Sequence, residues 1–420
     1  MEVYGRILLV AMPAFFVLVV LEKWWGWYQG KDTVRMNDMI ASLSSGITNV
    51  TKDVLGLSLV VISYGWMLDR FQVFSVGTGW ATYLLAFVAL DFAGYWVHRI
   101  AHEYNLFWNN HIVHHSSEEF NLACALRQSI SSVIKIFAVF LLPAAVLGVP
   151  PAVIATIAPL HLFAQFWYHT QHINKMGWLE YVIVTPSHHR VHHAINPEYL
   201  DRNYGQIFIV WDKMFGTFQP ELSETPCIYG VTRPVQTWNP IKINFMHLFL
   251  LIRDAWHASR LLDKLTIWFR PLGWRPEDVA QRYPVYKIQD VQVYQKYDAG
   301  NVPVMIRWSF VQMLMVLLSI AWLFANLSTI GAPAIFYYGA WIFLSVYAYT
   351  ELMDMNKNAV YWEMFRVLFG VAMVLWTDGW FGAEQFVPGL KYMLIGWFLF
   401  SGIFVYALSR RLIPAGNPSV

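Results

Sequence analysis

The chain has 420 residues, of which 57% are hydrophobic and 17% aromatic, whereas only 13% are charged. Soluble domains carry about 25% charged residues, so this composition excludes an ordinary soluble protein and indicates a membrane protein. The net charge of +2 is too small to indicate nucleic-acid binding. With only two cysteines, Cys124 and Cys227, the chain cannot form a disulfide framework or an iron–sulfur cluster held by four thiolates.

About nine apolar runs follow one another along the chain, and their lengths approach the roughly 20 residues of a membrane-spanning helix. They predict an all-α fold, a multi-pass integral membrane bundle with about nine spanning helices. The first run ends near Trp24 and Trp25, which are typical of an interfacial anchor, and no small-residue cleavage site follows it. We therefore interpret it as a retained helix and not as a signal peptide. The runs cover residues 7–21, 54–68, 81–97, 133–147, 151–167, 305–325, 333–352, 365–376 and 394–408.

These runs divide the chain into parts with different expected roles. Residues 1–80 are predicted to form N-terminal membrane helices, and residues 81–220 a histidine-rich catalytic region. Residues 221–303 are predicted to form a cytoplasmic or interfacial segment, and residues 304–420 C-terminal membrane helices. Two short amphipathic stretches in the third part, at 243–256 and 258–269, are expected to lie in the plane of the lipid headgroups.

Histidine is concentrated in one part of the chain: of 14 histidines, 12 lie between Asp91 and His193. Three boxes stand out, HRIAH at 98–102, HIVHH at 111–115 and HHRVHH at 188–193. On a helix, residues three or four apart share a face, so the rings of each box can point toward a common site. The second and third boxes end in two adjacent histidines, whose rings can diverge toward two metals. Polar residues at helix ends would explain one or two histidines but not three boxes.

The number and type of ligands indicate the metals. Neutral imidazole is the commonest side-chain metal ligand, and the boxes together exceed the four ligands of a structural zinc ion. Two metals are therefore expected. A site made of nitrogen ligands suits iron, zinc, copper or nickel better than magnesium or calcium.

The boxes must come together, so they lie at one face of the membrane, and the two-pass hairpin at 133–167 allows this. If that face is in the cytoplasm, nearly all lysines and arginines between the helices lie inside, as the positive-inside rule expects. Only Arg6, Arg70 and Lys391 then lie near the outer face. The N-terminus is then outside and the C-terminus inside. The endoplasmic reticulum and a bacterial inner membrane are both compatible with this arrangement.

The boxes resemble those of the membrane-bound fatty acid hydroxylase/sterol desaturase superfamily. Within it, DFAGYWVHRIAHE, HHSSEEFNLACALRQS, TPSHHRVHHAIN and NYGQIFIVWDKMFGTF are similar, in order and spacing, to the alkylglycerol monooxygenase branch. The motif-bearing match covers about residues 91–218. The resemblance implies two irons held almost wholly by histidine, activation of O2, and attack on an unactivated C–H bond of a membrane lipid.

Carried over by position, the resemblance implies a set of metal ligands. Relatives show H-x-x-x-H where this chain has Gln165 and His169, so either Gln165 is a weaker ligand or one iron has a ligand fewer. His172 and His188 are left with hydrogen-bonding roles by default, and His161 with a packing role. The implied ligands are His98, His102, His111, His114, His115, His169, His189, His192 and His193.

Acidic and basic residues beside the boxes are candidates for supporting roles. Asp91 lies seven residues before His98, two turns along one helix face, and is expected to orient that ring. Glu103 directly follows the first box and is the candidate to contact a pterin, as a catalytic or cofactor-binding group. Glu118 is a second cofactor candidate, with a solvated turn as the alternative. Arg127 is a third, with phospholipid phosphate as the alternative partner.

The sequence thus predicts an integral membrane di-iron monooxygenase that acts on a lipid. If the branch is right, the substrate is an ether lipid: hydroxylation next to the ether oxygen gives a hemiacetal, which collapses to a fatty aldehyde and a glycerol derivative. Tetrahydrobiopterin would be the reductant. No dinucleotide fingerprint or haem-attachment motif is visible, so the electrons are expected from outside the chain.

Two alternatives remain open at this point. The first is a sterol, fatty-acid, sphingolipid or carotenoid hydroxylase or desaturase supplied by a separate electron-transfer protein. The second is a metal transporter or sensor, whose ligands would be expected near the middle of the membrane rather than at one face. The sequence does not predict an oligomeric state.

Overall fold

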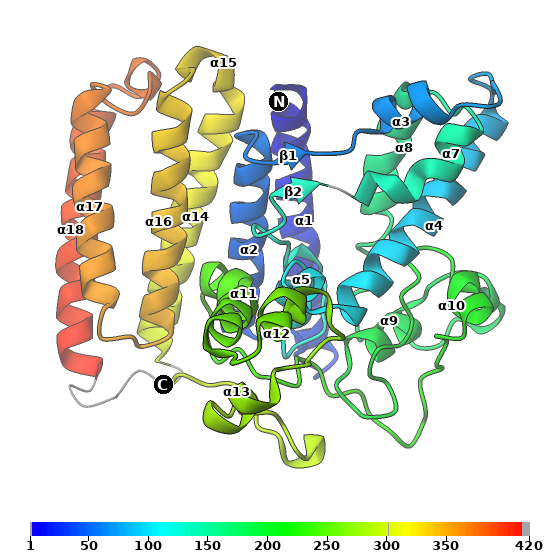
Figure 1. The fold of residues 1–420 in the computed structure, drawn as a ribbon. Helices are drawn as coiled ribbons and strands as arrows, with labels where there is room; N and C mark the ends of the chain where they lie inside the picture. The colour runs from blue at the N-terminus through cyan, green and yellow to red at the C-terminus, as the bar shows by residue number, and fades with distance from the viewer. Residues whose placement is uncertain (1, 136, 301, 414–420) are drawn as a thin grey trace.

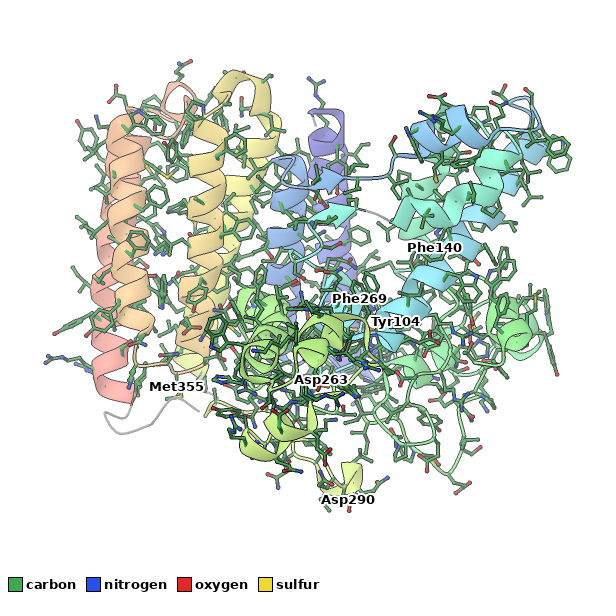
Figure 2. All side chains as sticks on the ribbon, in the orientation of Figure 1. Tyr104, Phe140, Asp263, Phe269, Asp290 and Met355 are labelled. Carbon is green, nitrogen blue, oxygen red and sulfur yellow. The ribbon has the colours of Figure 1, made fainter. Side chains whose placement is uncertain are left out.

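The computed structural model describes residues 2–135, 137–300 and 302–413 and is mostly helical (Figure 1). The long helices run alongside one another, and the shorter helices α9 to α13 lie together at one end of them, the lower end in Figure 1. The start of α1 and the end of α18 lie at opposite ends of this arrangement. With all side chains drawn, nitrogen and oxygen atoms gather mainly among the short helices of the lower end (Figure 2).

Five helices within the described residues are long and apolar enough to cross a membrane. Between 17% and 39% of each candidate span is buried inside the protein, so most of its surface is available to lipid. These features make the chain an integral membrane protein. The helices are α1 (Glu2–Tyr28), α4 (Trp80–Glu103), α14 (Pro303–Ala325), α17 (Ala359–Trp376) and α18 (Leu390–Leu412).

The expectation of about nine regular spanning helices is met only in part. Helix α16 (Ala334–Met353) has the length of a span, but its tyrosines and Trp341 lower its hydropathy, and helix α2 (Met36–Val54) is rich in serine and threonine. The run at 54–68 does not form one spanning helix, and beyond Val54 only its end, from Tyr64, is helical, as the start of α3 (Tyr64–Phe71). Helix α2 ends at Val54, Gly56 takes a left-handed φ of 67°, and the chain continues as strand β1 (Leu59–Val60).

The predicted hairpin at 133–167 is also built differently. Its first arm contains strand β2 (Ile134–Lys135), the 3₁₀ turn η2 (Phe137–Leu141) and the short helix α7 (Leu142–Val146), and its second arm is the 13-residue helix α8 (Pro151–Phe163). Strands β1 and β2 pair in parallel, with Leu59 opposite Ile134. β-branched residues in both segments favour this extended pairing over a helix.

The remaining elements flank the histidine boxes or connect the long helices, and all except the 18-residue α11 are short. They are α3 (Tyr64–Phe71), α5 (Asn105–Trp108), α6 (Ile112–His115), η1 (Cys124–Leu126), η3 (Gly177–Tyr181), α9 (Pro186–His193), α10 (Val210–Phe215), α11 (Pro240–His257), α12 (Leu261–Thr266), η4 (Ile267–Phe269), α13 (Glu277–Arg282), η5 (Val291–Val293), α15 (Leu327–Ile330) and η6 (Ala383–Gln385).

The largest hydrophobic core joins α1 and α2 to the C-terminal bundle, by which we mean helices α14, α16, α17 and α18. A smaller core holds α4 against α7 and α8. Helix α2 turns its serines inward: Ser45 donates to the backbone carbonyl of Gln128, and Ser42 accepts from Arg127. The polar face of α2 thus supports the segment that follows the second histidine box.

Candidate metal centre

The structure brings the nine histidines implied as ligands into two adjacent groups. In each group, one ring nitrogen from every member lies within 4.8 Å of the others. The groups are neighbours, since the ring centroids of His115 and His193 are 4.4 Å apart. The first group is His98, His102, His111, His115 and His192, and the second is His114, His169, His189 and His193.

The spacing within the boxes decides which group each ring joins. The i, i+4 pairs stay together: the Nε2 atoms of His111 and His115 are 3.0 Å apart, and those of His189 and His193 are 3.1 Å apart. The adjacent residues of each doublet separate instead. The ring planes of His114 and His115 lie 87° apart, and those of His192 and His193 lie 88° apart. Each H-x-x-H-H box therefore contributes to both groups.

Five rings are fixed by a hydrogen bond on the side away from the group. The Nδ1–H groups of His98, His114, His169 and His192 donate to the backbone carbonyls of Tyr204 (2.8 Å), Arg127 (3.3 Å), Gln165 (3.0 Å) and Arg202 (2.9 Å), in that order. The Nδ1–H of His102 faces the carboxylate of Asp201 at 3.3 Å. Such contacts set the tautomer and the orientation of metal-binding histidines.

These bonds decide what the inward nitrogens can do. A carbonyl only accepts hydrogen bonds, so each of these Nδ1 atoms carries the proton and the Nε2 atom carries a lone pair. The Nε2 atoms of His98 and His192 are buried without a partner, and those of His114 and His169 face each other at 3.4 Å. Neither can donate to the other. Lone pairs converging in a dry site are the arrangement that a cation stabilises.

Burial keeps the rings outside the membrane-spanning helices uncharged. Removal from water, reinforced by neighbouring imidazoles, holds the pKa of His111, His115 and His193 well below the usual range for histidine. Burial lowers the pKa of His169 to about 3. These imidazoles are therefore neutral at neutral pH, which is the form that binds a metal.

An aromatic shell excludes water from the two groups. Trp108 packs on His102 with ring centroids 5.0 Å apart, Phe120 stacks on His169 at 5.8 Å, and Tyr168 lies 4.4 Å from His189. His98 and His102 occupy the last turns of α4, at the end of a candidate span. The groups thus lie where an apolar helix meets the short helices of the lower end (Figure 1).

Asp91, which was expected to orient the His98 ring, makes no hydrogen bond to it, since the Nδ1–H of His98 donates to the Tyr204 carbonyl instead. Its carboxylate accepts hydrogen bonds from the backbone amides of Ile207 and Phe208 and from the indole of Trp211, and it pairs with His161 at 2.8 Å. Asp91 therefore holds the 207–211 loop.

Asp212 holds the adjoining turn by accepting from the amides of Tyr204 and Gly205, each at 2.7 Å. Since the Tyr204 carbonyl fixes His98, Asp91 and Asp212 orient that ring indirectly, through the backbone.

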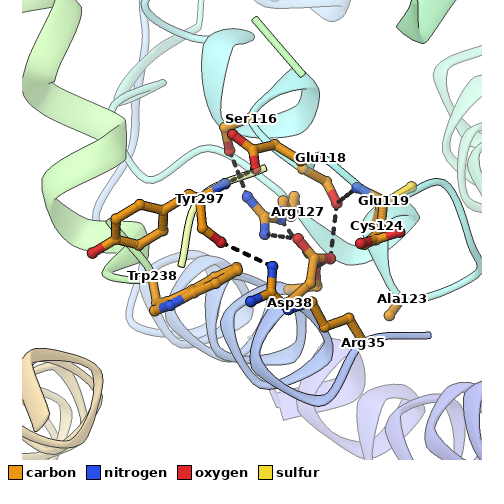
Figure 3. A network of polar contacts seen from close by, with 12 residues as sticks. Arg35, Asp38, Ser116, Glu118, Glu119, Ala123, Cys124, Arg127, Trp238 and Tyr297 are labelled. Carbon is orange, nitrogen blue, oxygen red and sulfur yellow. Dashed lines mark hydrogen bonds and ion pairs between the residues drawn. The ribbon is translucent and has the colours of Figure 1, made fainter. Parts of the chain in front are cut away.

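Glu118 and Arg127 are engaged inside the protein and not with a headgroup or solvent (Figure 3). The Arg127 guanidinium donates to Asp38, Ser42 and Ser116, and only 2% of the residue is exposed. Glu118 accepts from the hydroxyl of Tyr294 and the amide of Tyr297, and burial raises the pKa of its carboxyl. Two of the three partners of Arg127, Asp38 and Ser42, lie on α2, which the sequence pattern alone did not place against the second histidine box.

Glu103, by contrast, remains accessible. It pairs with Arg99 at 2.7 Å, and its side chain is 40% exposed. It lies one residue beyond His102, at the end of α4.

The residues that the sequence left open fall outside both groups. Gln165 turns its amide to Gln206 and to the His161 carbonyl, and it offers only its own carbonyl to His169. His188 accepts from the amide of Thr185 at the start of α9, and burial lowers its pKa to about 4. His172 lies 3.1 Å from the Thr33 hydroxyl. Neither His172 nor His188 belongs to either group.

Sequence reasoning missed three supporting carboxylates. Glu22, just before the tryptophans of the interfacial anchor, accepts from the Thr170 hydroxyl and from the amide of Leu122, each at 2.6 Å, and so connects α1 to the segments that follow the second box and His169. Asp38 pairs with Arg127 at 2.6 Å, and Asp201 faces His102. For Glu22 and Asp38 a signal existed, because acidic residues in or beside apolar helices are costly unless they have a partner.

Known proteins share these features. The profile of the fatty acid hydroxylase family matches residues 83–217, which include all nine clustered histidines. The alkylglycerol monooxygenase of Homo sapiens is 33% identical over 365 residues, covering 85% of this chain and 80% of that protein. The chain belongs to the fatty acid hydroxylase family.

Two further alkylglycerol monooxygenases are similar in sequence to this fatty acid hydroxylase. The alkylglycerol monooxygenase of Danio rerio is 33% identical over 398 residues, or 94% of this chain and 87% of that protein. The one from Xenopus tropicalis is 39% identical over 265 residues, or 62% and 58%. No solved structure matches the chain. The protein is therefore a membrane-bound monooxygenase of this family, related to alkylglycerol monooxygenases, with a histidine-rich metal site.

Proposed function

We propose that this chain is a di-iron lipid monooxygenase that hydroxylates the ether-adjacent carbon of an alkylglycerol-type lipid. The proposed products are a fatty aldehyde and a glycerol derivative. The proposal rests on the two histidine groups and on the similarity to proteins named alkylglycerol monooxygenase, which extends over most of the chain.

The observation that carries the metal assignment is the set of inward lone pairs. Each group contains rings whose Nδ1–H is committed to a backbone carbonyl, so their Nε2 atoms can only accept or ligate. We assign His98, His102, His111, His115 and His192 to one iron and His114, His169, His189 and His193 to the other. When bound, the irons would supply the activation of O2 and the one-electron chemistry that no side chain provides.

The protein's own residues would position the substrate and exclude water. The centre lies at the end of α4, where an alkyl chain in the bilayer and a polar head at its surface can both reach it. The aromatic shell of Trp108, Phe120 and Tyr168 keeps the ligands dry. We place the centre on the cytoplasmic side, because that orientation leaves few lysines and arginines near the outer face.

For the reductant, we retain Glu103 as the candidate contact of a tetrahydrobiopterin. It is partly exposed and adjacent to the first box, whereas Glu118 and Arg127 are occupied by internal partners. We do not propose a headgroup-binding role for Arg127, because each of its three guanidinium nitrogens already donates a hydrogen bond within the protein.

The test is substrate turnover by the purified protein in lipid nanodiscs. Supplied with iron, O2, an alkylglycerol and reduced tetrahydrobiopterin, it should release a fatty aldehyde, and Glu103→Gln should raise the KM for the pterin more than it lowers kcat. Turnover only of sterols, fatty acids, sphingolipids or carotenoids, and only with an electron-transfer protein, would contradict the proposal and favour that alternative.

A further inference from the structure

A cavity of about 270 Å³ lies in the C-terminal bundle, well away from the histidine groups. All four helices of the bundle line it, together with the segment between α17 and α18. In Figure 1 these helices stand on the left, whereas α9 lies at the lower right. Leu318 and Phe386 on its lining are 67% and 74% exposed, so the cavity borders the surface that faces lipid.

The lining is largely aromatic and aliphatic, with a few polar exceptions. Gln312 is 2% exposed, and neither its amide nitrogen nor its amide oxygen has a hydrogen-bond partner. The indole nitrogen of Trp341 is also buried and unpartnered. Polar side chains in membrane helices usually bond to a neighbouring helix, but Gln312 in the middle of α14 does not. Its amide has an oxygen that can accept and a nitrogen that can donate, and the indole nitrogen of Trp341 is a further donor.

The charge beside the cavity is cancelled internally. Arg366 lines the cavity and is bound by both carboxylate oxygens of Glu363, and it also donates to Ser401 at 2.7 Å. Both charged residues are at least 98% buried, at 2% and 1% exposure. An anionic head would therefore have to compete with Glu363 for the arginine, whereas a neutral head would not.

We propose that this cavity binds a neutral, single-chain lipid whose head carries a hydroxyl group. A hydroxyl can donate to the Gln312 oxygen and accept from its nitrogen, which satisfies both orphaned atoms. A cavity of about 150 Å³ accommodates benzene, so the volume here suits a small head and the first part of an alkyl chain better than a fused ring system. The rest of the chain would extend past Leu318 and Phe386 into the bilayer.

The experiment is photolabelling of the full-length protein in phosphatidylcholine nanodiscs. The probe is a long-chain alcohol with a diazirine on its chain, and the matched probes are the fatty acid of the same chain and a sterol with the same photogroup. The alcohol should label peptides of the C-terminal bundle most strongly. Gln312→Leu should reduce that labelling about tenfold, the effect of losing roughly one to two hydrogen bonds.

Two further variants separate binding from folding. Trp341→Phe keeps an aromatic ring, smaller than the indole, but removes the N–H, and should reduce labelling by a smaller factor. Met315→Leu changes an apolar lining residue without altering the polar groups, and should leave labelling unchanged. The alcohol should also raise the melting temperature of the wild type but not of Gln312→Leu, while that variant without lipid should melt no lower than the wild type.

Several results would overturn the proposal. They are equal labelling in the wild type and Gln312→Leu, stronger labelling by the fatty acid or the sterol than by the alcohol, or labelling that avoids the C-terminal bundle. The readout requires no turnover, so it is independent of whether the proposed monooxygenase function is correct.

Discussion

The C-terminal bundle and the metal-centre region, residues 80–215, use buried polar groups in opposite ways. In the bundle, long regular helices hold their buried charged groups by side-chain pairing, as in Arg366 with Glu363 and Ser401. In the metal-centre region two of the three helices that carry ligands are short, four residues in α6 and eight in α9, and the long α4 contributes His98 and His102 only from its last turns. There, backbone carbonyls of irregular segments orient the rings. Loops fix the ligands, and buried carboxylates such as Asp91 and Asp212 fix the loops.

The largest effect should come from removing a ligand of either group. His192→Ala and His193→Ala are neighbours in sequence but remove ligands from different groups. Each should lower turnover by at least about a thousandfold, or roughly 4 kcal/mol of transition-state stabilisation. Steady-state release of aldehyde measures this effect.

The matched control for these variants lies on the same helix. His188→Ala removes a ring that belongs to neither group and accepts from the amide of Thr185. It should cost about 1 kcal/mol of stability, as lost caps do, and leave turnover within a few-fold of the wild type. A thousandfold loss in this variant would show that the grouping is wrong.

The buried arginines allow a direct comparison of the two regions. Arg127→Met and Arg366→Met each leave a buried carboxylate, that of Asp38 or Glu363, without its cation. Both should lose about 3–5 kcal/mol of stability, measured by thermal unfolding in detergent. Only Arg127→Met should also lower the iron content, because the Arg127 carbonyl fixes His114.

Adding Asp38→Asn to Arg127→Met should recover part of the lost stability, since no unpaired charge then remains. If Arg366→Met loses as much iron as Arg127→Met, the two regions are not distinct in the way described.

A histidine outside both groups should show acid sensitivity that does not involve a metal. Burial, with nearby Arg233, lowers the pKa of His247 to about 4, and its Nε2–H donates to the Asn105 carbonyl at 2.9 Å. The unfolded chain binds this proton near pH 6.5, so stability is complete above that pH and falls as the pH drops toward 4. The loss is on the order of 3 kcal/mol.

His247→Gln keeps a donor for the carbonyl but does not titrate. Between pH 7 and pH 4.5 the variant should lose less unfolding free energy than the wild type. Denaturant titrations at several pH values measure this difference. An unchanged pH dependence would show that this ring is not a neutral, buried donor.

The smallest effect is expected at Asp201. This residue faces His102 at 3.3 Å, but its side chain is 58% exposed, so solvent screens the contact. Asp201→Asn retains an acceptor and should reduce iron affinity by no more than about tenfold, at the lower limit for residues that support metal ligands. Iron retention during chelator titration checks this expectation, and complete loss of iron would contradict it.

Much of the centre could be predicted from the sequence because helical spacing is a local property. The i, i+4 pairs and the divergence of each doublet follow from the positions of His111, His114 and His115 alone. The backbone carbonyls that accept hydrogen bonds from the rings could not be predicted. The carbonyls of Arg202 and Tyr204 are aimed by a turn in which Asp201 and Asn203 take positive φ values of 56° and 58°, and this conformation is set by tertiary contacts.

The fold was predicted less completely. Hydropathy located α1, α4, α14, α17 and α18, which face lipid, but it cannot distinguish a helix from a strand in a short buried run. The run at 133–147 therefore looked like a spanning helix, although its β-branched start pairs with β1. The inward polar face of α2 was visible in the sequence only as a serine-rich stretch.

The central claim is that two irons are held by two separable groups of histidines. The most direct test is the iron content of purified protein for the wild type, His192→Ala and the double variant His192→Ala with His193→Ala. We expect close to two irons per chain in the wild type, about one in the single variant and nearly none in the double variant. One iron or another metal in the wild type, or full iron content in the double variant, would contradict the account.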